Sequence, residues 1–541
     1  MYLKNSLISI NEFFYSTKDQ IRKLYLKSNL YNNKISKIEI SNITYRPSLS
    51  ILSCLIKYDK KKIKIEELDK DNIWENKLLT GNNLDKLNNF YWLFSIDLKS
   101  SSNITQSIIE KWIEKNQNYN SLTWQIDILS KRIISWITNS KLTYDQGDTK
   151  YKKKFNFSIN KQINHLINEI SKSQSVDDKL LGCTAIIITG LSYENEKFLN
   201  YGLELLRKII INSFDDEYFP KTRSIRQLNF YLKYFVLVRE LLKESFNNIP
   251  EYLDEIIFYL GKSYVIFSKP EQSLLFNGNH QNDLKEFNKY LSLYKYKFEN
   301  SNNEVGGYAI LKNKNCILAM DVGNSPQKRF SHNYQSGALS FEFFYKDKKL
   351  ISNSGYFQDY KSKLNLISKS TAAHSTLIID NHSSCSFRNS RSYKTLENGL
   401  KISDKNIVNE KNYWLIKASH NGYLKKLGIL HERSLEYFAE KDKLIGTDKI
   451  ISKNKLESKK YDIRFHMEPG VKLTKTLDNK TILIEIENSG WKFSSNCENI
   501  NIESGIYFGN KNLSSENQNI CLSGKTKDIS LDIKWVFEKI Q

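Results

Sequence analysis

The hydrophobic pattern of this chain changes its period near residue 300. Between about residues 84 and 295, apolar residues recur at helical spacing, and after about residue 300 they alternate with polar ones. A helical half followed by a strand-rich half is typical of an α+β multidomain protein. We therefore expect a mainly helical domain over residues 1–300 and a strand-rich domain over residues 301–541.

The helical half has the pattern of a series of helical hairpins without a strict sequence repeat. Ile108, Ile109, Trp112 and Ile113 form one apolar stripe, and LLGCTAIIITGLSY is apolar on all sides, as a buried helix would be. Such an array can close into a ring of paired helices or stay open as a solenoid, and the pattern leaves both open. Residues 1 to about 75 are expected to be irregular, with strand-like pieces such as KKIKIEEL.

The strand-rich half contains segments such as YAILKNKNCILAMDVG, GALSFEFFYKDKKLISNSG and ERSLEYFAEKDKLIGTDKI, joined by tight polar turns. Roughly a dozen strands in about 240 residues indicate a sandwich of stacked antiparallel sheets. The boundary between the halves lies near NKYLSLYKYKFENSNNEVGGY, where Gly306 and Gly307 interrupt the pattern.

The chain is strongly basic, with a net charge of +21. A basic surface suits a polyanionic partner, whereas the abundance of Lys, Asn and Ile with only 6 Pro would also follow from an AT-rich genome. Both explanations stay open. The lysines are spread along the chain, and no P-loop or dinucleotide-binding glycine pattern occurs, so neither nucleic acid nor a nucleotide is an expected partner.

No apolar run of about 18 residues occurs, so we expect no membrane-spanning helix. The N-terminus, MYLKNSLISINEFFYSTKDQIRKLY, lacks the apolar core and cleavage site of a signal peptide, which favours a cytoplasmic location by sequence and leaves the compartment open. The cysteines lie far apart, which excludes a short-spaced zinc motif and a disulfide framework and predicts isolated thiols. These cysteines are Cys54, Cys183, Cys316, Cys385, Cys497 and Cys521.

Several blocks of the sequence occur in the order seen in a known family. They are SLTWQIDILSKRIISWI and LLFNGNH in the helical half, and SGALSFEFF, TAAHSTLIIDN, NGYLKKLGILHERSLEY, IRFHMEPGV and GWKFSSNCENINIESGIYFG in the strand-rich half. Together they resemble the heparinase II/III-like family, whose members cleave acidic polysaccharides by β-elimination. The resemblance implies a partly closed α/α toroid followed by a β-sandwich, an acidic polysaccharide partner of the glycosaminoglycan or alginate type, and a bacterial periplasm or cell envelope.

β-Elimination at a uronic acid requires that the carboxylate be neutralised, that a base remove the C5 proton and that an acid protonate the leaving oxygen. In the family, a histidine in the loop before the SGALSFEFF-like strand takes part in proton transfer. Counting back from Phe341, the family's two loop histidines fall on Asn333 and Gln335, and His332 lies one position from the first. The resemblance therefore implies His332 as a catalytic residue, with Asn333 and Gln335 orienting substrate. The alternative is that His332 is a surface loop histidine.

The family's structural zinc has ligand positions that correspond to Gln335, Asn353 and His374. Neutral amides are poor zinc ligands beside imidazole and carboxylate. We therefore expect no tightly bound zinc and no other cofactor. His374 is expected to support its loop through hydrogen bonds and is a candidate for substrate contact.

In the segment DDEYFPKTRSIRQLNFYL, Tyr218 and Arg223 stand where the family often has a Gly-Gly-His turn. Arg223 could clamp a substrate carboxylate, and Tyr218 could transfer a proton if nearby cations lowered its pKa. The alternative is that Tyr218 packs and that Arg223 pairs with Asp215 or Asp216. Tyr423 is a further candidate for substrate stacking.

Three functions stay open from the sequence. The leading hypothesis is a polysaccharide lyase whose site lies in a cleft between the two domains. The second is a glycan-binding or envelope-associated protein that kept the lyase scaffold without catalysis, because Asn333, Gln335 and Asn353 replace stronger chemical groups. The third is an interaction protein in which the sandwich caps the helical array. The oligomeric state is left open.

Overall fold

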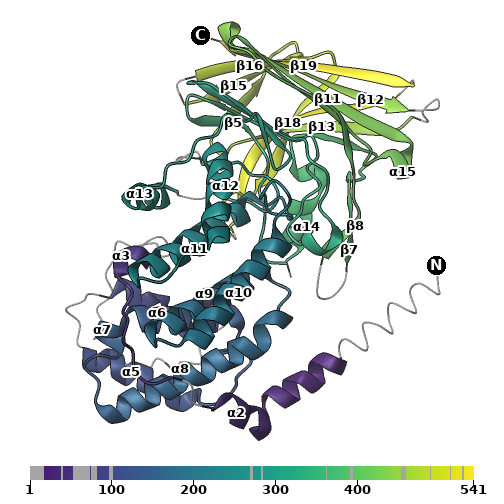
Figure 1. The fold of residues 1–541 in the computed structure, drawn as a ribbon. Helices are drawn as coiled ribbons and strands as arrows, with labels where there is room; N and C mark the ends of the chain where they lie inside the picture. The colour runs from purple at the N-terminus through teal and green to yellow at the C-terminus, as the bar shows by residue number, and fades with distance from the viewer. Residues whose placement is uncertain are drawn as a thin grey trace. The chain divides into compact units, whose positions relative to one another are not determined.

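The structure of this protein is a computed structural model (Figure 1). It describes residues 17–37, 40–52, 74, 82–96, 102–268, 272–281, 284–360, 362–389, 394–452, 458–487, 489–511, 513–526 and 529–540. The chain forms two compact units. The first, here called the helical unit, comprises Met1–Asn212 and Phe230–Ile257, and the second, here called the sandwich unit, comprises Ser213–Asn229 and Phe258–Gln541. The expected division at residue 300 stays a prediction.

Helices dominate the described residues up to Leu293, as the period of the sequence predicts. Their bounds are α2 (Asn29–Ile35), α3 (Leu49–Leu52), α4 (Asn82–Asn88), α5 (Ser102–Lys115), α6 (Ile126–Thr138), α7 (Ser140–Thr143), α8 (Thr149–Glu169), α9 (Val176–Ser192), α10 (Glu196–Ser213), α11 (Ile225–Glu244), α12 (Glu251–Phe267) and α13 (Lys285–Leu293). Among the described residues, no helix combines the length and apolar character that crossing a bilayer requires.

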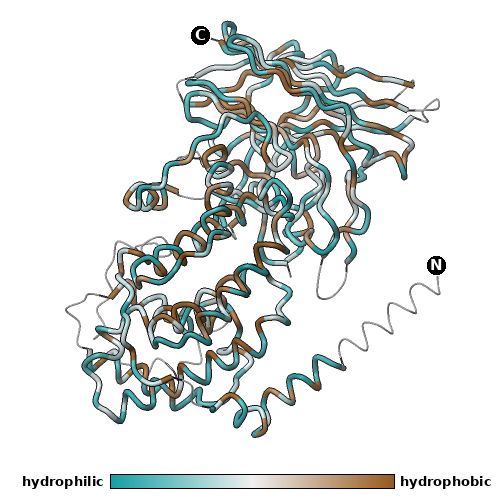
Figure 2. The backbone as a smooth tube through the Cα atoms, viewed as in Figure 1, coloured by the Kyte–Doolittle hydropathy of each residue, from teal (hydrophilic) through white to brown (hydrophobic). Residues whose placement is uncertain are grey.

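The helical unit is built around the predicted apolar stripes. Trp112 of α5 and Trp136 of α6 meet edge to face, with ring centroids 5.4 Å apart, and Phe90 packs against both rings. Helix α9 is buried from Leu180 to Ser192, which confirms the expectation of a buried helix. Figure 2 shows that hydrophobic stretches of the chain fall along helices such as α9 and along the strands of the large sheets.

The expectation of an irregular N-terminal segment is wrong for part of it. Residues 17–26 are helical, and α2 begins at Asn29 because the Ser28 hydroxyl accepts a hydrogen bond from the main-chain N–H of Tyr31. Tyr31 is buried in the helical unit, where its hydroxyl lies 2.8 Å from His165 Nδ1 of α8. These helices are too short to show a clear period in the sequence. The strand-like KKIKIEEL and Cys54 lie outside the described residues.

The sandwich unit contains two large antiparallel sheets and a small hairpin (Figure 1). One sheet has the order β1-β2-β3-β4-β5-β13-β18-β17, with β6 also paired to β13, and the other has the order β14-β15-β16-β19-β12-β11-β10-β9. The bounds in the first sheet are β1 (Glu304–Val305), β2 (Tyr308–Lys312), β3 (Cys316–Asp321), β4 (Phe341–Tyr345), β5 (Lys348–Ser352), β6 (Leu377–Ile379), β13 (Lys460–Met467), β17 (Asn499–Tyr507) and β18 (Ser515–Lys525). The others are β7 (Ser386–Asn389), β8 (Lys394–Asn398), β9 (Ile402–Asn409), β10 (Tyr413–His420), β11 (Ile429–Phe438), β12 (Lys443–Ser452), β14 (Lys472–Lys475), β15 (Thr481–Ile486), β16 (Ser489–Ser495) and β19 (Ser530–Ile540).

The core of the sandwich lies between the two large sheets. Phe341 of β4 stacks on Trp535 of β19, with centroids 5.4 Å apart, and Phe465 of β13 meets the same indole edge to face at 4.8 Å. Every second residue of β11 and β12 is buried, which is the alternation that the sequence shows. The expected helical array followed by an antiparallel sandwich is therefore confirmed.

A buried charged cluster crosses this core. Asp448 of β12 accepts from Arg433 Nε and Nη2 at 2.7 and 2.9 Å, and from the Trp535 indole at 2.8 Å. His431 Nε2 lies 2.7 Å from Asp448 Oδ1, and His431 Nδ1 lies 3.2 Å from His420 Nε2. Burial raises the pKa of Asp448, but Arg433 and His431 outweigh burial and hold that pKa well below its usual range. The carboxylate is therefore charged and fully paired.

We predict that Asp448→Asn lowers the free energy of unfolding by about 3–5 kcal/mol, because it leaves the buried Arg433 charge without a counterion. Urea unfolding at neutral pH measures this change. The matched control is Asp532→Asn on neighbouring β19, since Asp532 is exposed and lies 3.8 Å from Lys449 Nζ. That control should change the free energy by about 1 kcal/mol or less. Equal losses in the two variants would contradict the assignment.

Candidate functional site

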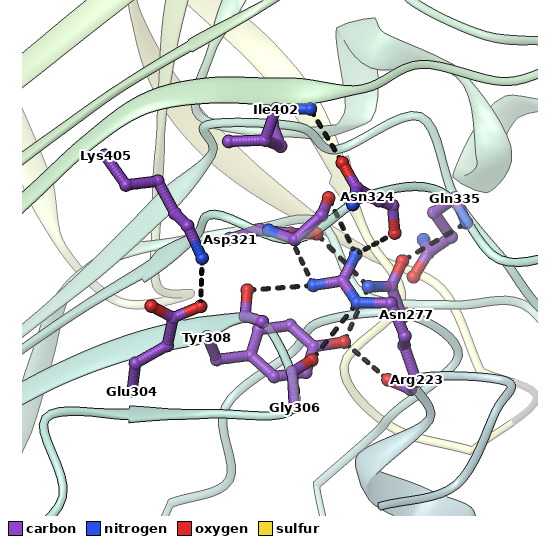
Figure 3. Close-up of polar contacts among 12 residues, drawn as sticks. Arg223, Asn277, Glu304, Gly306, Tyr308, Asp321, Asn324, Gln335, Ile402 and Lys405 are labelled. Carbon is purple, nitrogen blue, oxygen red and sulfur yellow. Dashed lines mark hydrogen bonds and ion pairs between the residues drawn. The ribbon is translucent and has the colours of Figure 1, made fainter. Parts of the chain in front are cut away.

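Arg223 lies at the centre of a buried polar network in the sandwich unit (Figure 3). Its Nη2 atom lies 2.6 Å from Asp321 Oδ1 at the end of β3. The guanidinium also donates to four main-chain carbonyls at 2.9 to 3.2 Å. These carbonyls belong to Gly306, Gly307, Gly323 and Asn324. Together the five acceptors match the five N–H groups of an arginine.

Burial alone would lower the pKa of Arg223, but Asp321 reverses the shift and keeps the guanidinium charged. The predicted alternative pairing with Asp215 or Asp216 is wrong, because Asp321 is the partner. Asp215 Oδ1 instead accepts from the main-chain N–H groups of Glu217 and Phe219 within its own turn. The role of Arg223 as a substrate clamp stays a prediction, and protein acceptors occupy its donors here.

The network continues from Asp321 through Asn277 to Gln335. Asn277 Nδ2 lies 3.2 Å from Asp321 Oδ2, and Asn277 Oδ1 accepts from the main-chain N–H of Gln335 at 3.4 Å. The Gln335 side chain accepts from the N–H of Gly278 at 2.9 Å and donates to the carbonyls of Gly355 and Ser368. Gln335 is fully buried, so its amide joins three segments of the chain.

Asn333 and Tyr356, in two of the segments that Gln335 joins, contact each other. The Tyr356 hydroxyl donates to Asn333 Oδ1 at 3.2 Å, next to the Gly355 carbonyl that Gln335 holds. Gly278 adopts φ +81°, and a Cβ there would lie 2.9 Å from Asn333 Cβ, so only glycine allows this approach. Burial raises the pKa of Tyr356, whereas Asn365 and the Arg226 cation lower it, and the hydroxyl stays protonated at neutral pH.

Two histidines accompany this contact. His332 is half-buried beside Asn333, and burial together with the Lys369 cation lowers its pKa, so the imidazole is neutral at pH 7. Lys369 Nζ also donates to the main-chain carbonyl of His332. His280 Nδ1 lies 3.2 Å from Gln358 Nε2. His280 and Tyr356 were missed as site residues, although LLFNGNH and SGYFQDY contain them.

The remaining predicted site residues lie elsewhere in the sandwich unit. The Tyr218 ring stacks in parallel on Tyr259 of α12, with centroids 4.4 Å apart. Tyr423 is buried, and its hydroxyl donates to the main-chain carbonyl of Leu377 at 2.7 Å. The structure thus brings together Arg223, Gln335 and the loop containing His332 and Asn333, whereas Tyr218 packs on another ring and Tyr423 in the core. Their roles toward substrate stay predictions.

The three positions expected for zinc ligands do not fit a zinc ion. The Gln335 amide is engaged as described, and the Asn353 amide donates to Glu342 Oε1 at 3.1 Å and accepts from the N–H of Ser375 at 2.9 Å. His374 Nδ1 lies 2.8 Å from the Ser370 carbonyl, and burial lowers its pKa to about 4. Among the described residues its Nε2 has no hydrogen-bond partner, so this position offers one suitable ligand atom rather than three.

Comparisons with known proteins agree with this architecture. A family model described as heparinase II/III-like, C-terminal, matches residues 300–536. No curated protein matches the sequence. Among solved structures, heparinase III aligns with a TM-score of 0.66 at 12% identity, over 98% of this chain and 91% of that chain. At such identities the likeness concerns the fold.

Two further structures extend the comparison. A mutant of the heparan sulfate lyase HepC from Pedobacter heparinus aligns with a TM-score of 0.63 at 13% identity, over 94% of this chain and 86% of that chain. A Paenibacillus xanthan lyase aligns with a TM-score of 0.54 at 10% identity, over 97% of this chain and 60% of that chain. These alignments span the helical and strand-rich parts together, and the expected α/α toroid followed by a β-sandwich is confirmed.

We predict that the purified protein, dialysed after incubation with zinc, retains far less than one zinc ion per chain, because two of the three ligand positions are amides already bonded to the protein. Elemental analysis measures the content. His374→Ala serves as the control and should leave that content unchanged. About one zinc ion per chain in the wild type, lost in His374→Ala, would show the prediction to be wrong.

Proposed function

We propose that this protein is a polysaccharide lyase acting on a uronic-acid-containing glycan by β-elimination, because residues 300–536 match the heparinase II/III-like, C-terminal family model. The observation that carries the proposal is the placement of a neutral, half-buried His332 beside Asn333, whose amide the Tyr356 hydroxyl orients. A base and a carboxylate-binding donor on adjacent residues are two of the groups that this reaction needs.

In the proposed reaction, Asn333 binds the substrate carboxylate. Its Oδ1 accepts from Tyr356, which leaves the amide N–H groups to donate to a carboxylate and to withdraw charge from C5. The Arg226 cation, which already acts on the pKa of Tyr356, adds positive potential. Gln335, Arg223 and Tyr356 are positioning residues in this account, because their side chains hold the loops rather than the glycan.

His332 moves the proton. The neutral imidazole takes the proton from C5, the C4–O bond breaks as the C4–C5 double bond forms, and the leaving oxygen receives a proton from the imidazolium. Tyr218 is retained as the alternative proton donor. The location of the site in an interdomain cleft stays a prediction, as does a bacterial envelope location.

A glycan-binding protein without catalysis is the second candidate. It is favoured by the engagement of Arg223 and Gln335 with protein groups, since neither side chain keeps an unused donor for substrate. The two candidates differ in turnover rather than in affinity, so one assay series separates them.

We predict that His332→Ala lowers kcat by about 10²–10⁴-fold on the polymer that the wild type cleaves, because it removes the general base. Turnover on a panel of uronic-acid polymers, including heparan sulfate and alginate, is followed by the absorbance of the unsaturated product. His382→Ala is the matched control, since His382 is half-buried on another loop, with Nδ1 2.8 Å from the Asp380 carbonyl. It should keep wild-type turnover.

The pH profile gives an independent readout. Because the pKa of His332 is lowered, kcat/KM should stay high down to about pH 6.5 and fall only at lower pH, where the imidazole becomes protonated. Equal turnover by wild type and His332→Ala would remove His332 from the mechanism. If the wild type binds glycans but cleaves none of the polymers, the lyase proposal is rejected in favour of a glycan-binding protein.

A further inference from the structure

A pocket of about 560 Å³ opens on the sandwich unit at a place that the proposed reaction does not use. Three segments line it: the start of the β7–β8 hairpin, the end of β8, and the turn from β10 into α15 (Leu424–Leu427). The volume lies in the range of small-molecule sites. Eight of its twelve lining residues carry hydroxyl, amide, carboxylate or ammonium groups, and the other four are Cys385, Gly399, Gly422 and Leu424.

The pocket walls are joined to one another and to the core. Asn421 accepts from the N–H of Lys401 at 2.8 Å and returns a main-chain hydrogen bond to it. The N–H of Gly422 donates to buried His420 Nδ1 at 3.0 Å, and a Cβ on Gly422 would lie 2.5 Å from the Ser384 carbonyl. The lining segments are therefore close-packed and preformed, which lowers the ordering cost of binding.

Charge is distributed unevenly around the mouth of the pocket. Lys425 and Lys426 are both exposed, and neither has an ion-pair partner among the described residues. Glu397, on another of the lining segments, can accept hydrogen bonds from hydroxyl groups. Two ammonium groups against one carboxylate favour a ligand that carries negative charge, and the hydroxyl and amide lining favours one rich in hydroxyl groups.

We infer that this pocket binds an acidic saccharide unit, a sugar ring bearing a carboxylate or sulfate, at a site separate from the His332 loop. Lys425 and Lys426 would hold the anionic group, while Glu397, Asn398 and the serine hydroxyls would bind ring hydroxyls. The inference rests on the proposed function only for the identity of the polymer, since it would be a second contact with the same glycan.

The arrangement has a consequence for long substrates. A Ser384 hydrogen bond to the main-chain carbonyl of Ser336 links the pocket wall to the residue that follows Gln335. A polymer held at both places would gain effective concentration at the catalytic loop. A polymer that reaches both places should therefore bind more tightly than a monosaccharide does.

Lysine footprinting locates the ligand. Wild-type protein is acetylated with and without a heparan sulfate hexasaccharide, and modification is read by mass spectrometry. We expect labelling of Lys425 and Lys426 to fall severalfold, with no change at exposed Lys411 and Lys472. A neutral hexasaccharide and sodium sulfate should give no protection. Protection by sulfate equal to that by the hexasaccharide would reduce the site to one for simple anions and overturn the saccharide assignment.

Affinity supplies the second measurement. The double variant Lys425→Gln/Lys426→Gln should bind the hexasaccharide roughly tenfold more weakly or worse, because charge-assisted hydrogen bonds are lost. Lys411→Gln/Lys472→Gln removes the same charge elsewhere and should bind as the wild type does. Equal affinity of the two double variants would overturn the inference. Neither measurement uses turnover. A wild type that is inactive but shows this protection would therefore reject the proposed lyase activity and still support saccharide binding in the pocket.

Discussion

The buried ion pair between Arg223 and Asp321 is the interaction on which the candidate site depends. A guanidinium removed from water is stable only if its charge and donors are matched, and here one carboxylate and four carbonyls match them. Asp321 also accepts a hydrogen bond from the Asn277 side chain, and the Asn277 oxygen accepts one from the main-chain N–H of Gln335. Figure 3 shows Arg223, Asp321, Asn277 and Gln335 together, and through Gln335 this buried ion pair anchors the loop that also contains His332 and Asn333.

Amide groups join the segments around Gln335 and Asn353, two of the positions considered as zinc ligands. Gln335 connects its loop to Gly278, Gly355 and Ser368, and Asn353 connects the end of β5 to Glu342 and Ser375. Each amide offers a donor and an acceptor, so the two side chains connect these regions by hydrogen bonds. These hydrogen bonds hold the loop of Gln335 against its neighbours.

The sequence predicted the fold well because the fold follows from local periodicity. The switch from helical to alternating spacing separates α13 from β2, and LLGCTAIIITGLSY became the buried α9. The roles of individual polar residues were harder to predict, because they depend on partners far along the chain. Arg223 was identified as important, yet its partner lies 98 residues away, which no spacing rule reveals.

The same reason explains what was missed at the site. Gln335 bonds to Gly278 and Gly355, and these residues lie close in sequence to His280 and Tyr356. The pocket near Lys425 is likewise formed by three segments that lie apart in the sequence. Position counting from Phe341 did locate the loop of His332, because that loop directly precedes β4. Local order along the chain was thus predictable, whereas contacts between loops needed the structure.

Hydrogen exchange in Asp321→Asn tests the central claim most directly. If the ion pair anchors the site, residues 277–281, 331–336 and 353–358 should all exchange faster in this variant, while β11 and β12 keep wild-type protection. Glu304→Gln is the control, because it removes a partly exposed ion pair with Lys405 in the same region and should change none of the three segments. Unchanged exchange in the three segments of a folded Asp321→Asn protein would contradict the account.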